Sequence, residues 1–353
     1  MKRLLLLIST LALAACQENA TPPASAPPIP TQIIIPDEGA YTGAYIDFGE
    51  AEDTVTLEQI EEFEKNVGKH QAIIASSSYW GEQTFPLRNL QIISRHHSIP
   101  LIYWSPWDKP YEQDRPPDQF SLSAIVDGKW DAYIDKWADG AKAFGRPFMV
   151  AWGLEMNGTW FPWSSWYYGE KDTEAGHKIG AKLYQDAYHH IVDRVRARGA
   201  NNISWVFQVN NQSVPKTPWN AFRDYYPGDA YVDWLAMSAY GMQFPHSDWI
   251  TPKAAFQDAY AELCALSPTK PMMMAEWGIG EFPDQGNKAA WITEAFRLME
   301  HMPRLKAAIF WHERWENGDG SYSNLRTTSS IDALAAYRQG VSNPHWLAEP
   351  ELQ

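Results

Sequence analysis

The chain reads RPFMVAWGLEMNGTWFPW over residues 146–163, and its architecture follows from this segment. The apolar run from Phe148 to Leu154 predicts a buried strand, because apolar residues on both faces are typical of a parallel sheet covered on both sides. The strand ends at Glu155, which leads into a loop rich in tryptophan. Burial among aromatic rings raises the pKa of a carboxyl group, so Glu155 is a candidate general acid.

A second segment repeats this pattern further along the chain. It reads KPMMMAEWGIG over residues 270–280, and predicts a buried strand that delivers Glu276 to a glycine-rich turn. Glu155 and Glu276 are far apart in the sequence, so they meet only in a fold that gathers strand ends, as a (β/α)8 barrel does. A pair of carboxyl groups, one acid/base and one nucleophile, is what retaining cleavage of a glycosidic bond requires.

Eight strand signals alternate with helical ones, which predicts an α/β fold with a single (β/α)8 TIM barrel as the catalytic domain. The expected strands cover residues 43–49, 71–80, 100–107, 148–154, 202–210, 232–240, 270–276 and 305–313. The expected helices cover residues 56–68, 86–97, 130–145, 174–199, a segment starting at 251, and 287–301. No glycine-rich loop has the spacing of a dinucleotide fingerprint, so a doubly wound cofactor enzyme is disfavoured.

Composition narrows the class of ligand. The 353 residues are 45% hydrophobic and 20% charged, which suffices for one large core. A net charge of −14 without a long basic run gives no electrostatic footprint for nucleic acid, and disfavours a polyanionic substrate. The 18 tryptophans favour a carbohydrate cleft, because sugar rings pack on aromatic faces, although most of these side chains are expected to pack in the core.

The N-terminus has the features of a targeting segment. Met1–Arg3 is basic, Leu4–Leu13 is apolar, and residues 13–16 read LAAC, which resembles a bacterial lipobox. In such signals the cysteine, here Cys16, is lipidated and anchors the protein to a membrane. Gln17 in place of Asp favours the outer membrane, on its periplasmic or outer face. The alternative is an ordinary cleaved secretory signal.

These features divide the chain into three parts. Residues 1–15 are expected to be the signal peptide, and residues 16–38, rich in Pro, Ala, Ser and Thr, a lipidated and disordered tether. Residues 39–345 are expected to form the barrel. Cys264 would be the one cysteine left besides the lipidated residue, so no internal disulfide is expected, and its helical apolar surroundings indicate an inert thiol.

Three motifs give the chain a family resemblance. They are EMNGTW at residues 155–160, YYPGDAYVDW at 225–234 and AEWG at 275–278. In this order, at strand ends, they resemble glycoside hydrolase family 26, a clan A family best known for β-mannanases, over residues 40–335. The resemblance implies a retaining mechanism in a (β/α)8 barrel. This mechanism needs neither an organic cofactor nor a metal.

The resemblance also implies roles for individual residues. Glu155 would be the acid/base and Glu276 the nucleophile. Tyr240 looks like the tyrosine that hydrogen-bonds the nucleophile in such barrels, although a plain core tyrosine is the alternative. Trp160 and Trp311 look like sugar-contacting aromatics.

Other residues near strand ends are further candidates for substrate contact. They are Trp107, Asn157 and Trp163, while Trp315 is an alternative to the eighth-strand tryptophan. The histidines lack a metal-ligand spacing such as His-Glu-x-x-His, so no metal is expected.

One position departs from the family pattern. The family usually has His before the acid/base Glu, whereas this chain has Leu154. We expect a retaining endo-β-glycanase, monomeric, with β-1,4-mannan as the first substrate. A β-1,3/1,4-glucan, a xylan or an exopolysaccharide is the alternative substrate. A surface glycan-binding lipoprotein without catalysis is the rival from another class.

Overall fold

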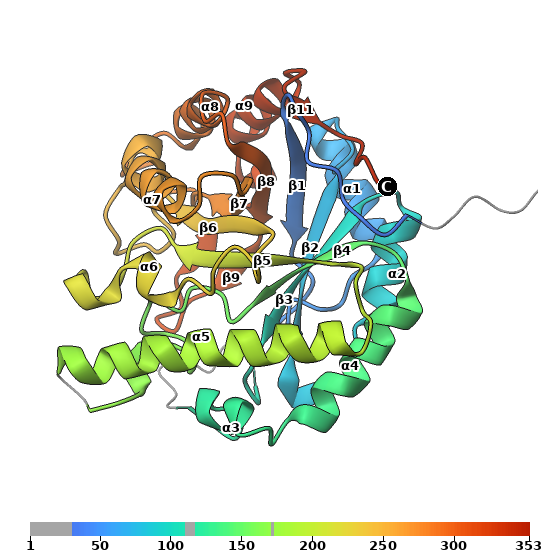
Figure 1. Cartoon of the computed structure of the whole chain (residues 1–353). Helices are drawn as coiled ribbons and strands as arrows, with labels where there is room; N and C mark the ends of the chain where they lie inside the picture. Colours follow the sequence, from blue (N-terminus) through green and yellow to red (C-terminus); the bar gives the residue numbers. More distant parts are fainter. Residues whose placement is uncertain (1–29, 110–116, 171–172) are drawn as a thin grey trace, which may run out of the picture.

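The predicted barrel is confirmed. The computed structural model describes residues 30–109, 117–170 and 173–353, in which eight parallel strands follow one another around a closed sheet. The strands are β1 (Ala40–Ile46), β2 (Ile73–Tyr79), β3 (Ile99–Ser105), β4 (Phe148–Trp152), β5 (Ile203–Asn210), β6 (Trp234–Tyr240), β7 (Met272–Gly278) and β8 (Leu305–His312). β1 pairs with both β2 and β8, which closes the barrel (Figure 1).

Helices follow the strands and surround the barrel (Figure 1). They are α1 (Leu57–Val67), α2 (Leu87–Arg95), α3 (Leu122–Val126), α4 (Asp131–Phe144), α5 (Glu174–Ala197), α6 (Phe222–Tyr225), α7 (Pro252–Leu266), α8 (Lys288–Met299) and α9 (Ile331–Val341). Their ends are set by local chemistry. Thr56 Oγ1 accepts from the Gln59 amide at 3.3 Å, which caps α1, and Gly68 ends that helix at φ 75°.

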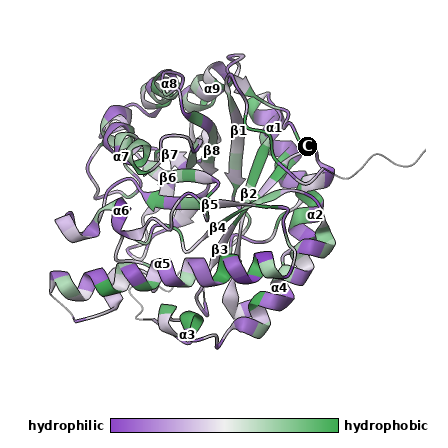
Figure 2. Cartoon of the chain, in the orientation of Figure 1, coloured by the Kyte–Doolittle hydropathy of each residue, from purple (hydrophilic) through white to green (hydrophobic). Residues whose placement is uncertain are grey.

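Large aromatic side chains fill the space between barrel and helices. Trp104 of β3 stacks on Trp137 of α4 with ring centroids 4.0 Å apart, and Trp152 of β4 stacks on Tyr184 of α5 at 5.4 Å. The surrounding helices carry hydrophobic and hydrophilic residues in alternation along their length, as expected of helices that bury one side (Figure 2). Much of the aromatic content is therefore structural.

Several elements escaped the sequence prediction. β1 begins at Ala40, three positions before the expected start at Gly43. After β8 the chain forms a small hairpin of β9 (Arg314–Glu316) and β10 (Tyr322–Asn324), and β11 (Trp346–Leu347) later pairs with β1. Among the described residues, no helix has both the length and the apolar character that a membrane span requires.

The folded domain extends past both expected boundaries. The amides of Thr31 and Gln32 donate to the Gln353 carbonyl at 2.8 Å, and the Ile34 amide donates to the Glu351 carbonyl at 2.9 Å. The last part of the expected tether thus pairs with the C-terminal end of the chain. The expected signal peptide and Cys16 lie outside the described residues.

Candidate active site

Four neighbouring strands bring the two glutamates together at the carboxyl end of the barrel. Glu276 lies in β7 and is 7% exposed, and Glu155 follows the end of β4 by three residues. Between them lie β5 and β6, which carry Gln208 and Ser238. Catalytic groups of TIM barrels come from this end of the strands, so the fold places the predicted pair where chemistry occurs.

Both oxygens of Glu276 accept hydrogen bonds. The Tyr240 hydroxyl donates to Oε2 at 2.7 Å, and the Gln208 side-chain amide donates to Oε1 at 2.9 Å. The Tyr240 contact is the one that the family resemblance implied. Two donors fix the carboxyl plane, which a nucleophile needs if one oxygen is to face the anomeric carbon.

Glu155 is held in an uncommon backbone conformation. Its φ is 53°, in the left-handed region that disfavours residues other than glycine, and its amide donates to the Gln208 carbonyl at 2.9 Å. The indole of Trp160 donates to Oε2 of Glu155 at 2.8 Å. Such conformations persist where the surroundings impose them and cluster at functional sites. The turn therefore aims this carboxyl away from the direction that a regular strand would give.

A hydrogen-bonded path links the two carboxyl groups. The side-chain amide of Gln208 donates to Ser238 Oγ at 2.9 Å as well as to Glu276. The Ser238 hydroxyl in turn donates to Glu155. Because both hydrogens of the Gln208 amide are used, the Ser238 proton is directed to Glu155. The pair is thus oriented by two polar side chains on the strands between them.

Burial raises the pKa of both carboxyls. The pKa of Glu276 lies well above its ordinary value, mainly because of burial and also because of the charge of Glu155; the donors Tyr240 and Gln208 oppose this. Burial raises the pKa of Glu155 too, against hydrogen bonds from Ser238 and Trp160. Two like charges this close do not form readily together, so the pair retains one proton to a higher pH than an isolated glutamate would.

Two of the predicted aromatics donate hydrogen bonds to carboxyl groups, Trp160 to Glu155 and Trp311 to Glu313. Trp160 is partly exposed next to Glu155. Trp311, at the end of β8, is 7% exposed and stacks on Tyr45 with centroids 3.9 Å apart, while its indole donates to Glu313 at 2.8 Å. Burial, followed by the charge of Glu52, raises the pKa of Glu313 to about 8. The Glu313 carboxyl therefore holds its proton to a higher pH than an isolated glutamate does.

Three predicted contact residues are not brought to the surface of the site. Trp163 is 1% exposed and its indole donates to the Leu154 carbonyl at 2.7 Å. Trp107 is 5% exposed and packs edge-on to Trp163. Asn157 is fully buried and exchanges hydrogen bonds with the Asn210 backbone at 2.8 and 2.9 Å. The polar groups of Trp163 and Asn157 already bond to backbone atoms of the loop after β4 and of β5, so these two side chains support that loop.

Sequence reasoning missed three polar residues of the site. Gln208 and Ser238 orient the carboxyls, and the Tyr103 hydroxyl donates to the carbonyl of Ala275, next to Glu276, at 2.7 Å. A signal was present, since each is a polar residue inside an apolar strand, where an unpaired polar group is costly. Such residues need partners, and at a strand's carboxyl end the partner is often a functional group.

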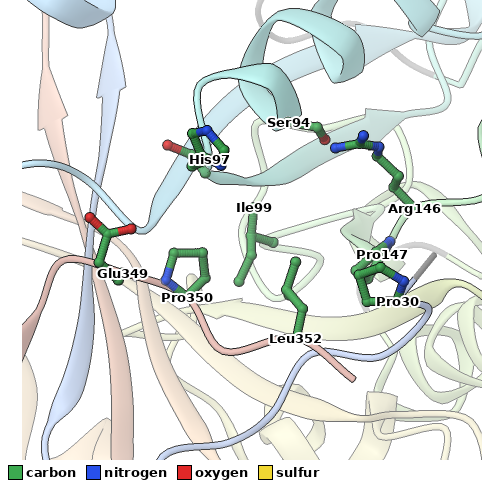
Figure 3. Close-up of a pocket in the computed structure, with 10 residues that line it drawn as sticks. Pro30, Ser94, His97, Ile99, Arg146, Pro147, Glu349, Pro350 and Leu352 are labelled. Atoms are coloured by element: carbon green, nitrogen blue, oxygen red, sulfur yellow. The ribbon is translucent and has the colours of Figure 1, made fainter. Parts of the chain in front are cut away.

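The opposite end of the barrel holds a separate cavity of about 160 Å³. It lies where β3 and β4 begin, and Ile99, Arg146 and Glu349 are among its lining residues (Figure 3). Neither glutamate of the pair lines it. In TIM barrels this end serves stability, so the cavity is not the candidate active site.

A closed (β/α)8 barrel with two neighbouring carboxyls at the carboxyl end of its strands, Glu276 buried and Glu155 partly exposed, defines the class of barrel glycoside hydrolases. The model of "Glycosyl hydrolase family 26" matches residues 75–295. The chain belongs to this family, as the motifs around Glu155 and Glu276 indicated.

Relatives within the family carry different names. Endoglucanase H of Acetivibrio thermocellus is 34% identical over 265 residues, which is 72% of this chain and 26% of the relative. A mannan endo-1,4-beta-mannosidase of Bacillus subtilis (strain 168) is 26% identical over 246 residues, 67% of this chain and 58% of the relative. The chain thus spans about a quarter of the first protein and less than two thirds of the second.

Solved structures agree on the fold. The YdhT protein from Bacillus subtilis has a TM-score of 0.63 at 20% identity, covering 89% of this chain and 87% of the other. Bacillus subtilis mannanase man26 has a TM-score of 0.61 at 21% identity over the same shares. At this identity the likeness supports the barrel itself.

Proposed function

We propose that this chain is a retaining endo-β-glycanase that hydrolyses a β-linked polysaccharide. The observation that carries the proposal is the pair of neighbouring carboxyls, Glu155 and Glu276, each held by hydrogen bonds at the carboxyl end of the barrel. Family membership and the relatives' names support it. Neither step of such a reaction requires a metal or an organic cofactor.

In the first step a Glu276 oxygen attacks the anomeric carbon while Glu155 gives its proton to the leaving glycosidic oxygen. In the second step Glu155 takes a proton from water, whose oxygen displaces Glu276 from the sugar. The shared proton of the pair fits this cycle, because one carboxyl must be neutral while the other is ionised. Tyr240 and Gln208 hold the nucleophile, and Trp160 holds the acid/base.

Substitution of each glutamate tests the reaction. We expect Glu276→Ala and Glu155→Ala to lower hydrolysis of the preferred glycan by several orders of magnitude. Azide should partly rescue Glu276→Ala, or else Glu155→Ala, by forming a glycosyl azide, and the anomeric configuration of that product identifies which residue is the nucleophile. A wild type that binds a glycan but leaves its length unchanged would instead establish the rival, a binding lipoprotein.

The substrate is a second question within the same class. We take β-1,4-mannan first, because three relatives are named mannan endo-1,4-beta-mannosidases and several similar structures are those of mannanases. A β-glucan is the second candidate. Two observations favour it: the 34% identity to Endoglucanase H, and Leu154 in place of the polar family residue.

Reducing-end release from mannan, mixed-linkage β-glucan, xylan and β-1,3-glucan separates these candidates. Mannose and glucose differ in the orientation of the 2-hydroxyl, so the side chain before the acid/base is placed to influence the choice. We expect Leu154→His to shift the ratio of kcat/KM for mannan and glucan by about tenfold, the effect of one hydrogen bond. An unchanged ratio would remove Leu154 from the specificity determinants.

We also propose that Cys16 is lipidated and anchors the protein in the cell envelope, at the outer membrane. The basic, apolar and LAAC segments at the N-terminus support this. Partition of the wild type into detergent, and of Cys16→Ser into the aqueous phase, is the expected result. If the wild type and Cys16→Ser partition equally, the N-terminal segment is an ordinary cleaved secretory signal.

A further inference from the structure

A cluster of metal-ligating side chains lies at the end of the barrel opposite the candidate active site. Glu64 is in the last turn of α1, His70 is in the loop before β2, and His96 caps the C-terminus of α2. One ligating atom from each of the three lies within 4.8 Å of the others. The side chains are 14 to 21% exposed, so an ion and a water molecule can reach them.

The two rings converge on one carboxylate. Nδ1 of His70 lies 2.8 Å from Oε1 of Glu64, and Nε2 of His96 lies 2.9 Å from Oε2. The Gln71 amide also donates to Oε1 of Glu64 at 2.9 Å. A backbone donor to a ligating carboxylate is typical of the outer shell of a metal site, where it fixes the orientation of the ligand.

The second nitrogen of His70 points to the same arrangement. Nε2 is buried and makes no full hydrogen bond, whereas Nδ1 faces the Glu64 carboxylate. Nδ1 is therefore the ring nitrogen placed to bind an ion together with Glu64.

We propose that Glu64, His70 and His96 bind one divalent transition-metal ion, with zinc the best match to two imidazoles and a carboxylate. Water would complete the tetrahedron. The ion would fasten the end of α1 to the end of α2, beneath strands β2 and β3. Its role is stabilisation, because the cluster lies away from the paired carboxyls.

Calorimetric titration of ZnCl2 into the EDTA-stripped, purified chain tests the proposal. We expect one equivalent to bind, the melting temperature to rise, and EDTA to reverse the rise; MgCl2 should do neither, since Mg²⁺ prefers oxygen ligands. His96→Gln and Glu64→Gln should each weaken zinc binding by about tenfold or more. His97→Asn is the matched control. It removes a neighbouring exposed imidazole, and Asn tolerates the φ of 65° at that position.

Each outcome decides the matter. Loss of the zinc-dependent rise in both cluster variants, with His97→Asn unchanged, supports the site. A wild type whose melting temperature ignores zinc overturns it, as does zinc binding that both variants retain. The cluster would then be a hydrogen-bonded network closed by Glu64, with any zinc bound elsewhere.

Discussion

At the level of single residues, the carboxyl groups that the proposed reaction uses lower the stability of the folded protein when they are ionised. Glu276 is 7% exposed, and its pKa is raised mainly by burial. An acid with a raised pKa binds its proton more tightly in the folded than in the unfolded chain. Stability therefore falls as pH rises above the ordinary glutamate value of 4.5 toward the raised one.

The direction of this change in stability with pH predicts how Glu276→Gln affects stability. The amide does not ionise, so the variant avoids the cost of a buried charge. We expect it to be inactive but more stable than the wild type by about 1 to 3 kcal/mol at pH 7, with little difference at pH 4. Urea unfolding at both pH values measures this. Glu61→Gln, on the exposed face of α1, is the control and should show no such trend.

If Glu276→Gln is the less stable protein at pH 7, the hydrogen bonds from Tyr240 and Gln208 outweigh burial. The carboxylate would then be preferred in the free protein.

The sequence indicated the glutamates but not their supports. Glu155 and Glu276 were predictable, because a charged residue at the end of an apolar strand is conspicuous. Gln208 and Ser238 were not, because their role depends on which strands become neighbours. Trp107 and Trp163, predicted as substrate contacts, are largely buried, and the sequence could not show this because a tryptophan near a strand end packs inward or outward according to the path of the loop.

At the level of elements, helix ends were the most predictable feature. Thr56 and Gln59 predicted the start of α1, and Gly68 its end, because these depend on residues close in sequence. The hairpin β9–β10 and the strand β11 escaped prediction. Strands of two or three residues have too little length for an alternating pattern.

Removal of the α1 cap tests how far local chemistry stabilises this element. Thr56→Ala deletes the acceptor for the Gln59 amide and should lower the free energy of unfolding by about 1 kcal/mol. Thr56→Ser keeps the hydroxyl and should stay within about 0.5 kcal/mol of the wild type. Chemical denaturation of the three proteins gives the comparison. Equal losses in both variants would assign the effect to the threonine methyl group.

At the level of the whole molecule, the C-terminal strand β11 packs against the start of the closed barrel. Trp346 of β11 is 2% exposed, donates to Glu300 at 3.2 Å and packs edge-on to Phe296. Its backbone partner is Ala40, at the start of β1. The sequence-based prediction ended the domain at residue 345. It missed β11 because the strand pairs with β1, which is distant in the sequence, so no local pattern indicates the contact.

Truncation of this side chain should therefore affect the entire domain. We expect Trp346→Ala to lower the free energy of unfolding by about 3 to 5 kcal/mol, the usual effect of deleting a buried tryptophan. Trp346→Phe keeps most of the volume and should lose clearly less. Calorimetric melting measures both. A loss below about 1 kcal/mol in the alanine variant would show that β11 is peripheral to the cooperative unit.

The pairing of residues 31–34 with residues 351–353 also fixes the end of the barrel at which the chain enters the domain. Pro30 and Leu352 line the cavity at the amino ends of the strands (Figure 3). Glu155 and Glu276 lie at the carboxyl ends. A support attached to the chain before Pro30 would therefore hold the domain at the end of the barrel opposite Glu155 and Glu276. The carboxyl ends of the strands, with Glu155 and Glu276, then lie on the side of the domain away from the point of attachment.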